Sequence, residues 1–151
     1  MIEGVKLRPL VKHMDDRGYL MEVLRDDDPE FTCFGQVYVS VCLPGIVKAW
    51  HAHRIQTDHL CIIHGLGKIG LYDGRKDSPT YRQTQTVVTG ELNSQLVQIP
   101  PLVWHGYMGL GNEPVYIMNV PTQHYNRQEP DELRVDPFEN DFGYEWIPKS
   151  R

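Results

Sequence analysis

Short runs of alternating apolar and polar residues, separated by glycine and proline, constrain the fold of this chain more than any other feature. Val37, Val39 and Val41 alternate with polar or small residues, which is the period of a β-strand with two different faces. We expect one face of this strand to pack and the other to line a pocket. Thirteen glycines and eleven prolines indicate turns between short strands. Further strands are expected at 60–65, 67–72, 84–88, 95–99, 107–110 and 115–120, the first two joined in a hairpin by a glycine turn.

The number and spacing of these strands predict an all-β fold, either a sandwich or a barrel. A chain of 151 residues has the size of one domain. We expect the barrel to cover about residues 5–125, and the acidic stretch 25–30 to be a solvated loop. The segment 126–151 is expected to pack back over the barrel, because its aromatic residues are too apolar to remain in water. These residues are Phe138, Phe142, Tyr144 and Trp146.

The charge balance excludes some classes of partner. Fifteen Lys and Arg against twenty Asp and Glu give a net charge of -5, so no global positive field would recruit nucleic acid or an anionic membrane. No apolar run approaches the ~20 residues that cross a bilayer, and the N-terminus lacks the apolar region of a signal peptide.

Three cysteines, Cys33, Cys42 and Cys61, form no CxxC pair, which argues against a disulfide framework. We expect a cytoplasmic protein.

A histidine pattern carries the chemical signal. His51 and His53 are two residues apart, and on a strand they would project into one cavity. Asp58 follows them, and His105 comes shortly after the double proline at 100–101. A single histidine on a strand is more often a packed or surface residue, but this compound spacing favours a functional cluster. The other histidines lack such a pattern and are expected to be structural: His13, His59, His64 and His124.

These elements resemble the two sequence motifs of the cupin superfamily, whose members are small jelly-roll β-barrels. Within it, the chain resembles the dTDP-4-dehydrorhamnose 3,5-epimerase-like family of nucleotide-4-keto-6-deoxysugar epimerases. Six ordered segments carry the resemblance: 15–18, 36–40, 45–53, 73–81, 99–107 and 143–148. The resemblance implies a single cupin domain over 1–151 and a proton-transfer enzyme without a cofactor. Such an enzyme removes a proton next to the 4-keto group and returns one to the opposite face of the enolate.

The resemblance also assigns catalytic roles. His51 matches the family's general base, and its imidazole titrates near neutral pH. The carboxylate that orients it would come from Asp136, Glu139 or Asp141, of which we name Asp136. The family's catalytic tyrosine is replaced by Asn119, an amide that cannot deliver a proton. Tyr38 stands where the family has asparagine, so we hypothesise that the two residues have exchanged places and that Tyr38 is the acid.

The substrate expected from the resemblance is a nucleotide sugar. Arg17 and Lys48 lie at positions that the family uses against the diphosphate, with Lys48 replacing an arginine. Tyr125 matches a tyrosine beside the nucleobase. The full expected binding set is Arg17, Gln36, Lys48, His53, His105, Asn119 and Tyr125. A homodimer is expected, because small jelly rolls leave edge strands that a partner can cover.

Two alternatives remain open. His53 stands where the epimerases have glutamine, and together with His51, Asp58 and His105 it rebuilds the ligand set with which many other cupins hold a transition metal. His51 cannot be a metal ligand and a base at the same time. The other alternative is a cupin that binds a sugar nucleotide without catalysis, or one that inverts a single carbon, because the usual tyrosine is missing.

Overall fold

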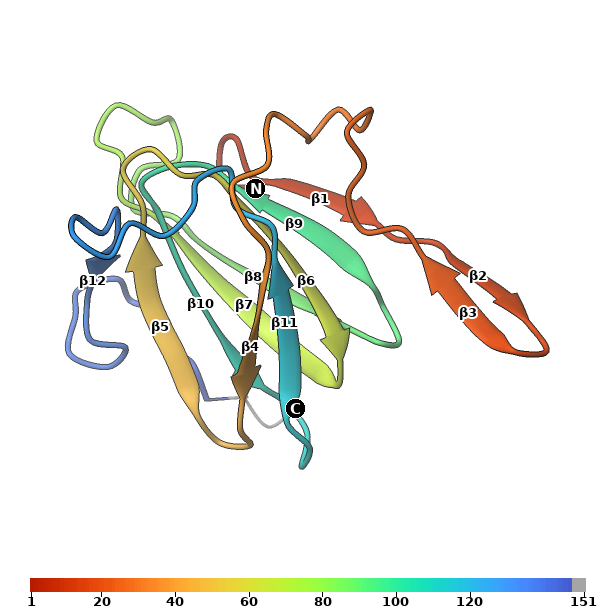
Figure 1. The fold of residues 1–151 in the computed structure, drawn as a ribbon. Coiled ribbons are helices and arrows are strands. Elements are labelled where there is room, and N and C mark those ends of the chain that lie inside the picture. The colour runs from red at the N-terminus through yellow and green to blue at the C-terminus, as the bar shows by residue number, and fades with distance from the viewer. Residues whose placement is uncertain (148–151) are drawn as a thin grey trace.

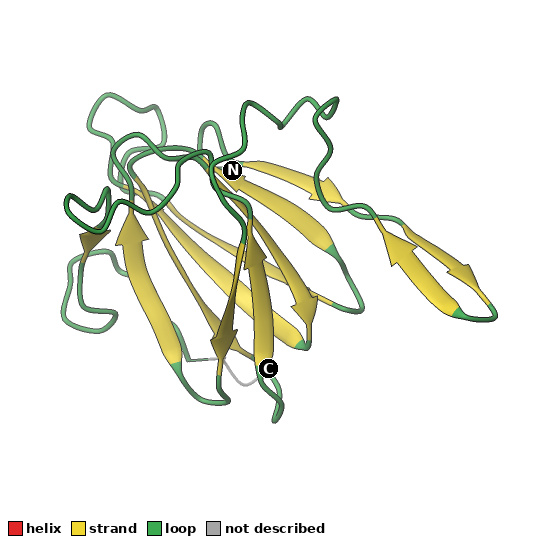
Figure 2. Ribbon diagram, in the orientation of Figure 1, coloured by secondary structure: helices red, strands yellow, loops and turns green. Residues whose placement is uncertain are grey.

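The computed structural model describes residues 1–147 and contains twelve strands and no helix in that range. Ten strands form two antiparallel sheets, ordered β1-β9-β6-β11-β4 and β12-β5-β10-β7-β8, and β2 pairs with β3 in a separate hairpin (Figures 1 and 2). The strands are β1 (Lys6–Pro9), β2 (Lys12–Asp15), β3 (Gly18–Met21), β4 (Tyr38–Cys42), β5 (Val47–Ala52), β6 (Asp58–His64), β7 (Leu66–Asp73), β8 (Thr84–Gly90), β9 (Gln95–Ile99), β10 (Val103–Gly109), β11 (Val115–Asn119) and β12 (Leu133–Arg134).

The chain crosses between the two sheets at most connections from β4 to β11, which is the winding of a jelly roll. The expected all-β cupin fold is therefore confirmed. We expected a hairpin between 60–65 and 67–72, and this prediction is wrong. The strands β6 and β7 are joined at Gly65 but belong to different sheets. Their apolar faces explain the difference: Ile62 and Ile69 are both fully buried between the sheets, where they pack face to face.

The main core lies between the sheets and follows the alternation of the strands. Leu60, Ile62, Ile69, Leu71 and Val97 are each at most 2% exposed. Each such side chain contributes about 1.5–3 kcal/mol through removal from water. The valine face of β4 was expected to pack, but in the structure Val37, Val39 and Val41 are exposed. In the single chain, this face of the first sheet is uncovered.

A second apolar cluster lies on the outer face of the other sheet, where the C-terminal segment covers it. Trp146 is buried against Trp50 with ring centroids 4.8 Å apart, and Phe142 stacks on Tyr72 at 3.9 Å. Gly70 makes room for this contact, since a Cβ there would lie 2.7 Å from Trp146. Residues 148–151 of the segment expected to pack over the barrel lie outside the described residues.

The stretch 25–30 is a loop, but it is not simply solvated. Arg8 of β1 pairs with Asp28 at 2.7 Å and with Glu30 at 3.1 Å, and Glu30 is buried. The Glu30 carbonyl oxygen also lies 3.0 Å from the buried ring of His59. His59 therefore has the structural role expected for it, and the loop is anchored to the barrel through that ring and Arg8.

The β2–β3 hairpin projects away from the barrel (Figure 1). Arg17 lies in its turn, and Met14 and Leu20 are exposed on its strands. No helix in residues 1–147 could span a membrane, since that range contains none.

Candidate active site

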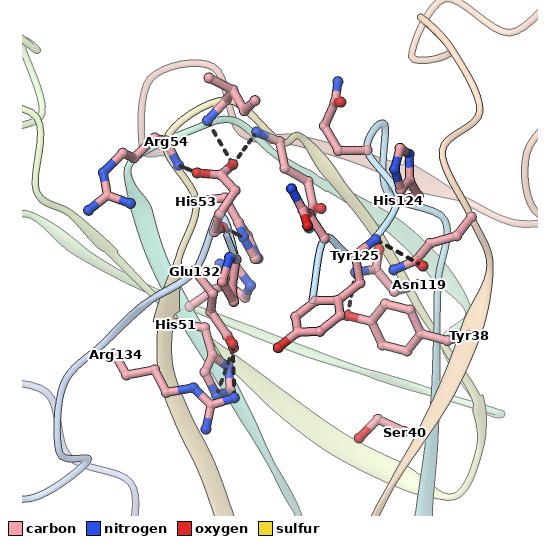
Figure 3. A pocket seen from close by; sticks show the side chains of 18 of the residues that line it. Tyr38, Ser40, His51, His53, Arg54, Asn119, His124, Tyr125, Glu132 and Arg134 are labelled. Atoms are coloured by element: carbon pink, nitrogen blue, oxygen red, sulfur yellow. Dashed lines mark hydrogen bonds and ion pairs between the residues drawn. The ribbon is translucent and has the colours of Figure 1, made fainter. Parts of the chain in front are cut away.

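A cavity of about 930 Å³ opens into the barrel and is closed on one side by the segment 123–134 (Figure 3). It gathers most of the residues expected from the sequence. Eight of them line it: Gln36, Tyr38, Lys48, His51, His53, His105, Asn119 and Tyr125. Arg17 and Asp136 are not among the lining residues.

The histidines reach the cavity from neighbouring strands of one sheet. His51 and His53 flank Ala52, which is fully buried, and both line the cavity, as the period of two predicts. His105 on β10 is the cross-strand partner of His51, and their ring centroids lie 6.2 Å apart. His51 and His53, at the end of β5, and His105, on β10, thus form one cluster of imidazoles.

His51 faces a carboxylate that the sequence reasoning did not name. Its Nε2 atom lies 3.9 Å from Glu132 Oε1, while Arg134 donates to Glu132 Oε2 at 2.8 Å. Burial lowers the pKa of His51 to about 4, and electrostatic repulsion from the nearby His105 ring adds to this decrease. The ring is therefore neutral at physiological pH and retains a free lone pair. Glu132 and Arg134 are two residues apart at the short strand β12, so their side chains share one face. This spacing was the only local signal for the pair.

Asp136, Glu139 and Asp141 do not occupy this position. The carboxylate of Asp136 is exposed and accepts hydrogen bonds from the backbone N–H groups of Phe138 and Glu139, both at 2.8 Å. Asp141 is also exposed and lies 3.4 Å from Arg82. Asp136 therefore holds a surface turn, and the expectation that it orients His51 is corrected in favour of Glu132.

Arg17 lies outside the cavity of its own chain. Its side chain is 85% exposed in the hairpin turn and pairs with Asp15. The expected contact with a diphosphate is therefore not formed within one chain, because the hairpin points away from the barrel (Figure 1).

Three of the four candidate metal ligands converge on one point. Nε2 of His53 and Nε2 of His105 lie 3.4 and 3.5 Å from Asp58 Oδ2. The other ring nitrogen of each histidine faces a backbone carbonyl, that of Asp131 for His53 and that of Val103 for His105. Because a carbonyl only accepts, each Nδ1 carries a hydrogen, so Nε2 is the ring atom of each histidine that could bind a metal.

The convergence of three electron-rich atoms, all within 4.8 Å of one another, fits a cation. His51 is not part of this group and faces Glu132 instead. The structure therefore corrects the four-residue ligand set to His53, Asp58 and His105. It also removes the conflict between a metal ligand and a base, because the two roles fall on different residues.

Tyr38 enters the cavity from β4 of the opposite sheet, and its ring lies across the cavity from His51 (Figure 3). Asn119 donates to Tyr38 Oη at 2.9 Å and to Asp58 Oδ1 at 2.7 Å. Burial raises the pKa of Tyr38 to about 12. The phenol therefore keeps its proton at physiological pH.

Three positively charged side chains line the cavity. Lys48 donates to Ser40 Oγ at 2.7 Å, and Arg54 and Arg134 also line the cavity. Both arginines were missed from the sequence, because isolated charged residues ordinarily indicate solvated surface. Gln36 accepts a hydrogen bond from the backbone of Tyr125 at 3.2 Å, so it supports that residue.

The cavity rim is fixed by a single carboxylate. Asp131 accepts hydrogen bonds from the backbone N–H groups of residues 54, 55 and 56 at 2.9–3.1 Å. Burial would raise the pKa of Asp131, but these hydrogen bonds outweigh it and lower the pKa. Asp131 thereby ties the segment that carries Glu132 to the loop that follows His53.

The two antiparallel sheets and their histidine-lined cavity form a cupin, and its relatives place the chain in the dTDP-4-dehydrorhamnose 3,5-epimerase-like class. More specifically, the chain belongs to the family described as polysaccharide biosynthesis C-terminal domain, whose model matches residues 13–133.

Relatives extend over most of the chain. The spore coat polysaccharide biosynthesis protein SpsL of Bacillus subtilis is 41% identical over 151 residues, covering 100% of both chains. A probable low-salt glycan biosynthesis epimerase, Agl13 of Haloferax volcanii, is 41% identical over 136 residues, covering 89% of this chain and 87% of the relative. The crystal structure of a dTDP sugar isomerase from Desulfovibrio desulfuricans G20 superposes with a TM-score of 0.91 at 32% identity, covering 96% and 92% of the two chains.

Proposed function

We propose that this protein is an epimerase that acts on a nucleotide-diphospho-4-keto-6-deoxyhexose in polysaccharide biosynthesis. The observation that carries the proposal is the half-buried, neutral His51 beside Glu132, facing Tyr38 across one cavity. The names of SpsL, Agl13 and the dTDP sugar isomerase support a role in glycan assembly and a nucleotide-sugar substrate. The nucleotide, the sugar and the number of inverted carbons are the subjects of the tests below.

The first step is removal of a proton from the carbon next to the 4-keto group. His51 accepts this proton, and the C–H electron pair moves into the enolate. Because Glu132 faces Nε2, Nδ1 is the atom that accepts the proton. Glu132 then stabilises the imidazolium by charge, and Arg134 holds Glu132 in place.

The second step is protonation of the enolate on its other face. Tyr38 reaches the cavity from the opposite sheet and retains its proton until the enolate forms. Delivery from that side inverts the carbon. The phenolate then recovers a proton from water, and His51 releases its own.

The substrate anchors are local charges and one aromatic ring. Lys48, Arg54 and Arg134 would neutralise the diphosphate at the cavity opening. Tyr125 is 54% exposed there and offers a face on which a nucleobase can stack. These contacts allow a protein with a net charge of -5 to bind a dianion.

We further propose a homodimer in which Arg17 completes the partner's cavity. The β2–β3 hairpin exposes Met14 and Leu20, and an isolated two-stranded hairpin is only marginally stable. Strand β4 is an edge strand with an exposed valine face, which a second copy can cover. We place the protein in the cytoplasm, where the core thiols of Cys42 and Cys61 remain reduced.

Deuterium uptake tests the proposed reaction. Candidate 4-keto-6-deoxy sugar nucleotides are incubated with the protein in deuterated water, and label is followed by NMR at C3 and at C5. We expect uptake and inversion at one or both carbons, and a loss of about 10²–10⁴-fold in His51→Gln. A protein that binds these compounds but incorporates no label is a non-catalytic binder, and the epimerase proposal is then wrong.

A metal-dependent cupin is the second candidate, and the convergence of His53, Asp58 and His105 favours it. These residues would hold a divalent transition metal, which when bound supplies a Lewis acid for an oxygen of the substrate. Elemental analysis of protein purified without an affinity tag tests this site. Stoichiometric metal that is lost in Asp58→Asn supports it, and metal below stoichiometry after purification with added zinc, manganese, nickel or iron excludes it.

A further inference from the structure

Asn119 has every polar atom of its side chain engaged in a hydrogen bond. It lies on β11, between β4 and β6, and is 1% exposed. Its strand register places it directly opposite Tyr38 on one side and opposite Leu60 on the other. The amide thus bridges the strand that carries Tyr38 and the strand that begins at Asp58.

The hydrogen bonds fix which way the amide points. The backbone N–H of His59 donates to Asn119 Oδ1 at 3.0 Å, and an N–H group can only donate. The two hydrogens of Nδ2 therefore point to Asp58 Oδ1, at 2.7 Å, and to Tyr38 Oη, at 2.9 Å. A flipped amide would place a nitrogen against the His59 N–H and an oxygen against the Asp58 carboxylate.

This orientation determines the direction of the Tyr38 proton. Because Asn119 donates to Tyr38 Oη, the phenol oxygen is an acceptor in this bond, and its own hydrogen must point elsewhere. Within residues 1–147, Asn119 is the one hydrogen-bond partner found for Oη. Since Tyr38 lines the cavity, its O–H is available to a bound substrate.

We infer that Asn119 is a positioning residue that aims the Tyr38 proton at the enolate. This inference rests on the proposed function, in which Tyr38 is the acid. When the proton moves, the Tyr38 O–H bond breaks, a C–H bond forms at the enolate carbon, and the electron pair of the O–H bond remains on Oη. The N–H group of Asn119 already points at that oxygen and stabilises the phenolate, which then regains a proton from water.

The arrangement gives Asn119 a specific role. By the sequence resemblance it replaces the acid of the epimerase family, and here it contacts the proposed acid, Tyr38, on the neighbouring strand. Without the amide, the phenol oxygen loses its fixed donor and the hydroxyl is free to rotate. Proton delivery should then fail more often, whereas proton removal by His51 from the other sheet should continue.

A double-mutant cycle tests the inference. Tyr38→Phe, Asn119→Leu and the double variant are compared by two rates in deuterated water, label uptake and inversion of the sugar carbon. We expect Asn119→Leu to slow inversion about 100-fold, the loss typical of a misplaced catalytic group, while uptake stays close to that of the unchanged protein. In the Tyr38→Phe background, adding Asn119→Leu should slow inversion no further, because the residue through which it acts is already gone.

Two further variants separate positioning from folding. Gln98→Leu removes another buried amide, which donates to the Glu30 carbonyl at 2.9 Å outside the cavity. We expect it to lower the melting temperature without changing the ratio of inversion to uptake. If Asn119→Leu does not fold, Asn119→Ser leaves room for water to solvate Asp58 but does not fix the phenol, and the same fall in the ratio is expected.

The outcomes distinguish the inference from the function on which it rests. If the unchanged protein neither takes up label nor inverts any 4-keto sugar nucleotide, the proposed function has failed. If the unchanged protein inverts its substrate, but Asn119→Leu and Tyr38→Phe multiply in the double variant, Asn119 acts independently and the inference is overturned. An equal fall of uptake and inversion in Asn119→Leu also overturns it, because positioning of the acid affects only the return of the proton.

Discussion

In the proposed mechanism, proton removal depends on His51 and Glu132, which lie 3.9 Å apart. Replacing Glu132 with glutamine removes the charge of this side chain but keeps its shape. We expect Glu132→Gln to lower kcat about 10²–10⁴-fold with little change in KM, because the amide cannot stabilise the imidazolium. Asp136→Asn is the matched control, since Asp136 is exposed and holds a turn outside the cavity. Steady-state kinetics on both variants checks the assignment, and a larger loss in Asp136→Asn would reverse it.

Asp73 shows that part of the epimerase-like sequence pattern serves stability. This carboxylate is fully buried and accepts hydrogen bonds from Arg75, Ser78 and Thr80. Burial would raise the pKa of Asp73, but these hydrogen bonds outweigh it and hold the pKa well below its usual range. The segment 73–81 is thus a loop closed around a buried anion.

The pH dependence of stability follows from this carboxylate. Because the pKa of Asp73 is lower in the folded chain than in the unfolded one, its contribution is complete above about pH 4 and is lost as the pH falls below that value. We expect Asp73→Asn to lower the free energy of unfolding by about 1–3 kcal/mol at pH 7 and to flatten its decline in acid. Urea unfolding between pH 3 and 7 measures this, and Asp77→Asn, at an exposed position of the same loop, should show neither effect.

Among the elements, the C-terminal segment has the clearest energetic role. Trp146 is 2% exposed and covers Trp50 on the outer face of β5. We expect Trp146→Ala to destabilise the fold by about 3–5 kcal/mol, because the small side chain leaves a cavity. Ile147→Ala changes the next residue, which is 77% exposed, and should have little effect. Similar unfolding midpoints for the two variants would show that the segment does not stabilise the barrel.

At the scale of the whole molecule, the proposed dimer makes a prediction about mixed subunits. If Arg17 serves the partner's cavity, Arg17→Ala should raise KM and His51→Gln should abolish turnover in the respective homodimers. A mixture of the two, refolded together, contains dimers with one cavity that has both His51 and a partner's Arg17. We expect activity in the mixture above the sum of the separate variants, measured at low substrate concentration. No gain on mixing, or a monomer in sedimentation analysis, would rule out this arrangement.

Local periodicity accounts for much of what could be predicted. The strands β4, β6, β7, β8, β9 and β11 lie within a few residues of the alternating runs that indicated them. His51 and His53 share a cavity because a strand has a period of two, which depends on the backbone alone. The first strands were missed because β1, β2 and β3 are four residues each and too short to show a clear alternation.

The sequence by itself determined an all-β chain, a pair of histidines on one face and the position of Tyr38 on a strand that lines the pocket. Only the tertiary structure decided which carboxylate meets His51, because Glu132 and Asp136 lie in the same distant segment, only four residues apart, and differ in how that segment packs. It also separated His51 from the group of His53, Asp58 and His105. Side-chain direction along a strand is a local property of the backbone, whereas contacts between distant segments depend on the path of the whole chain.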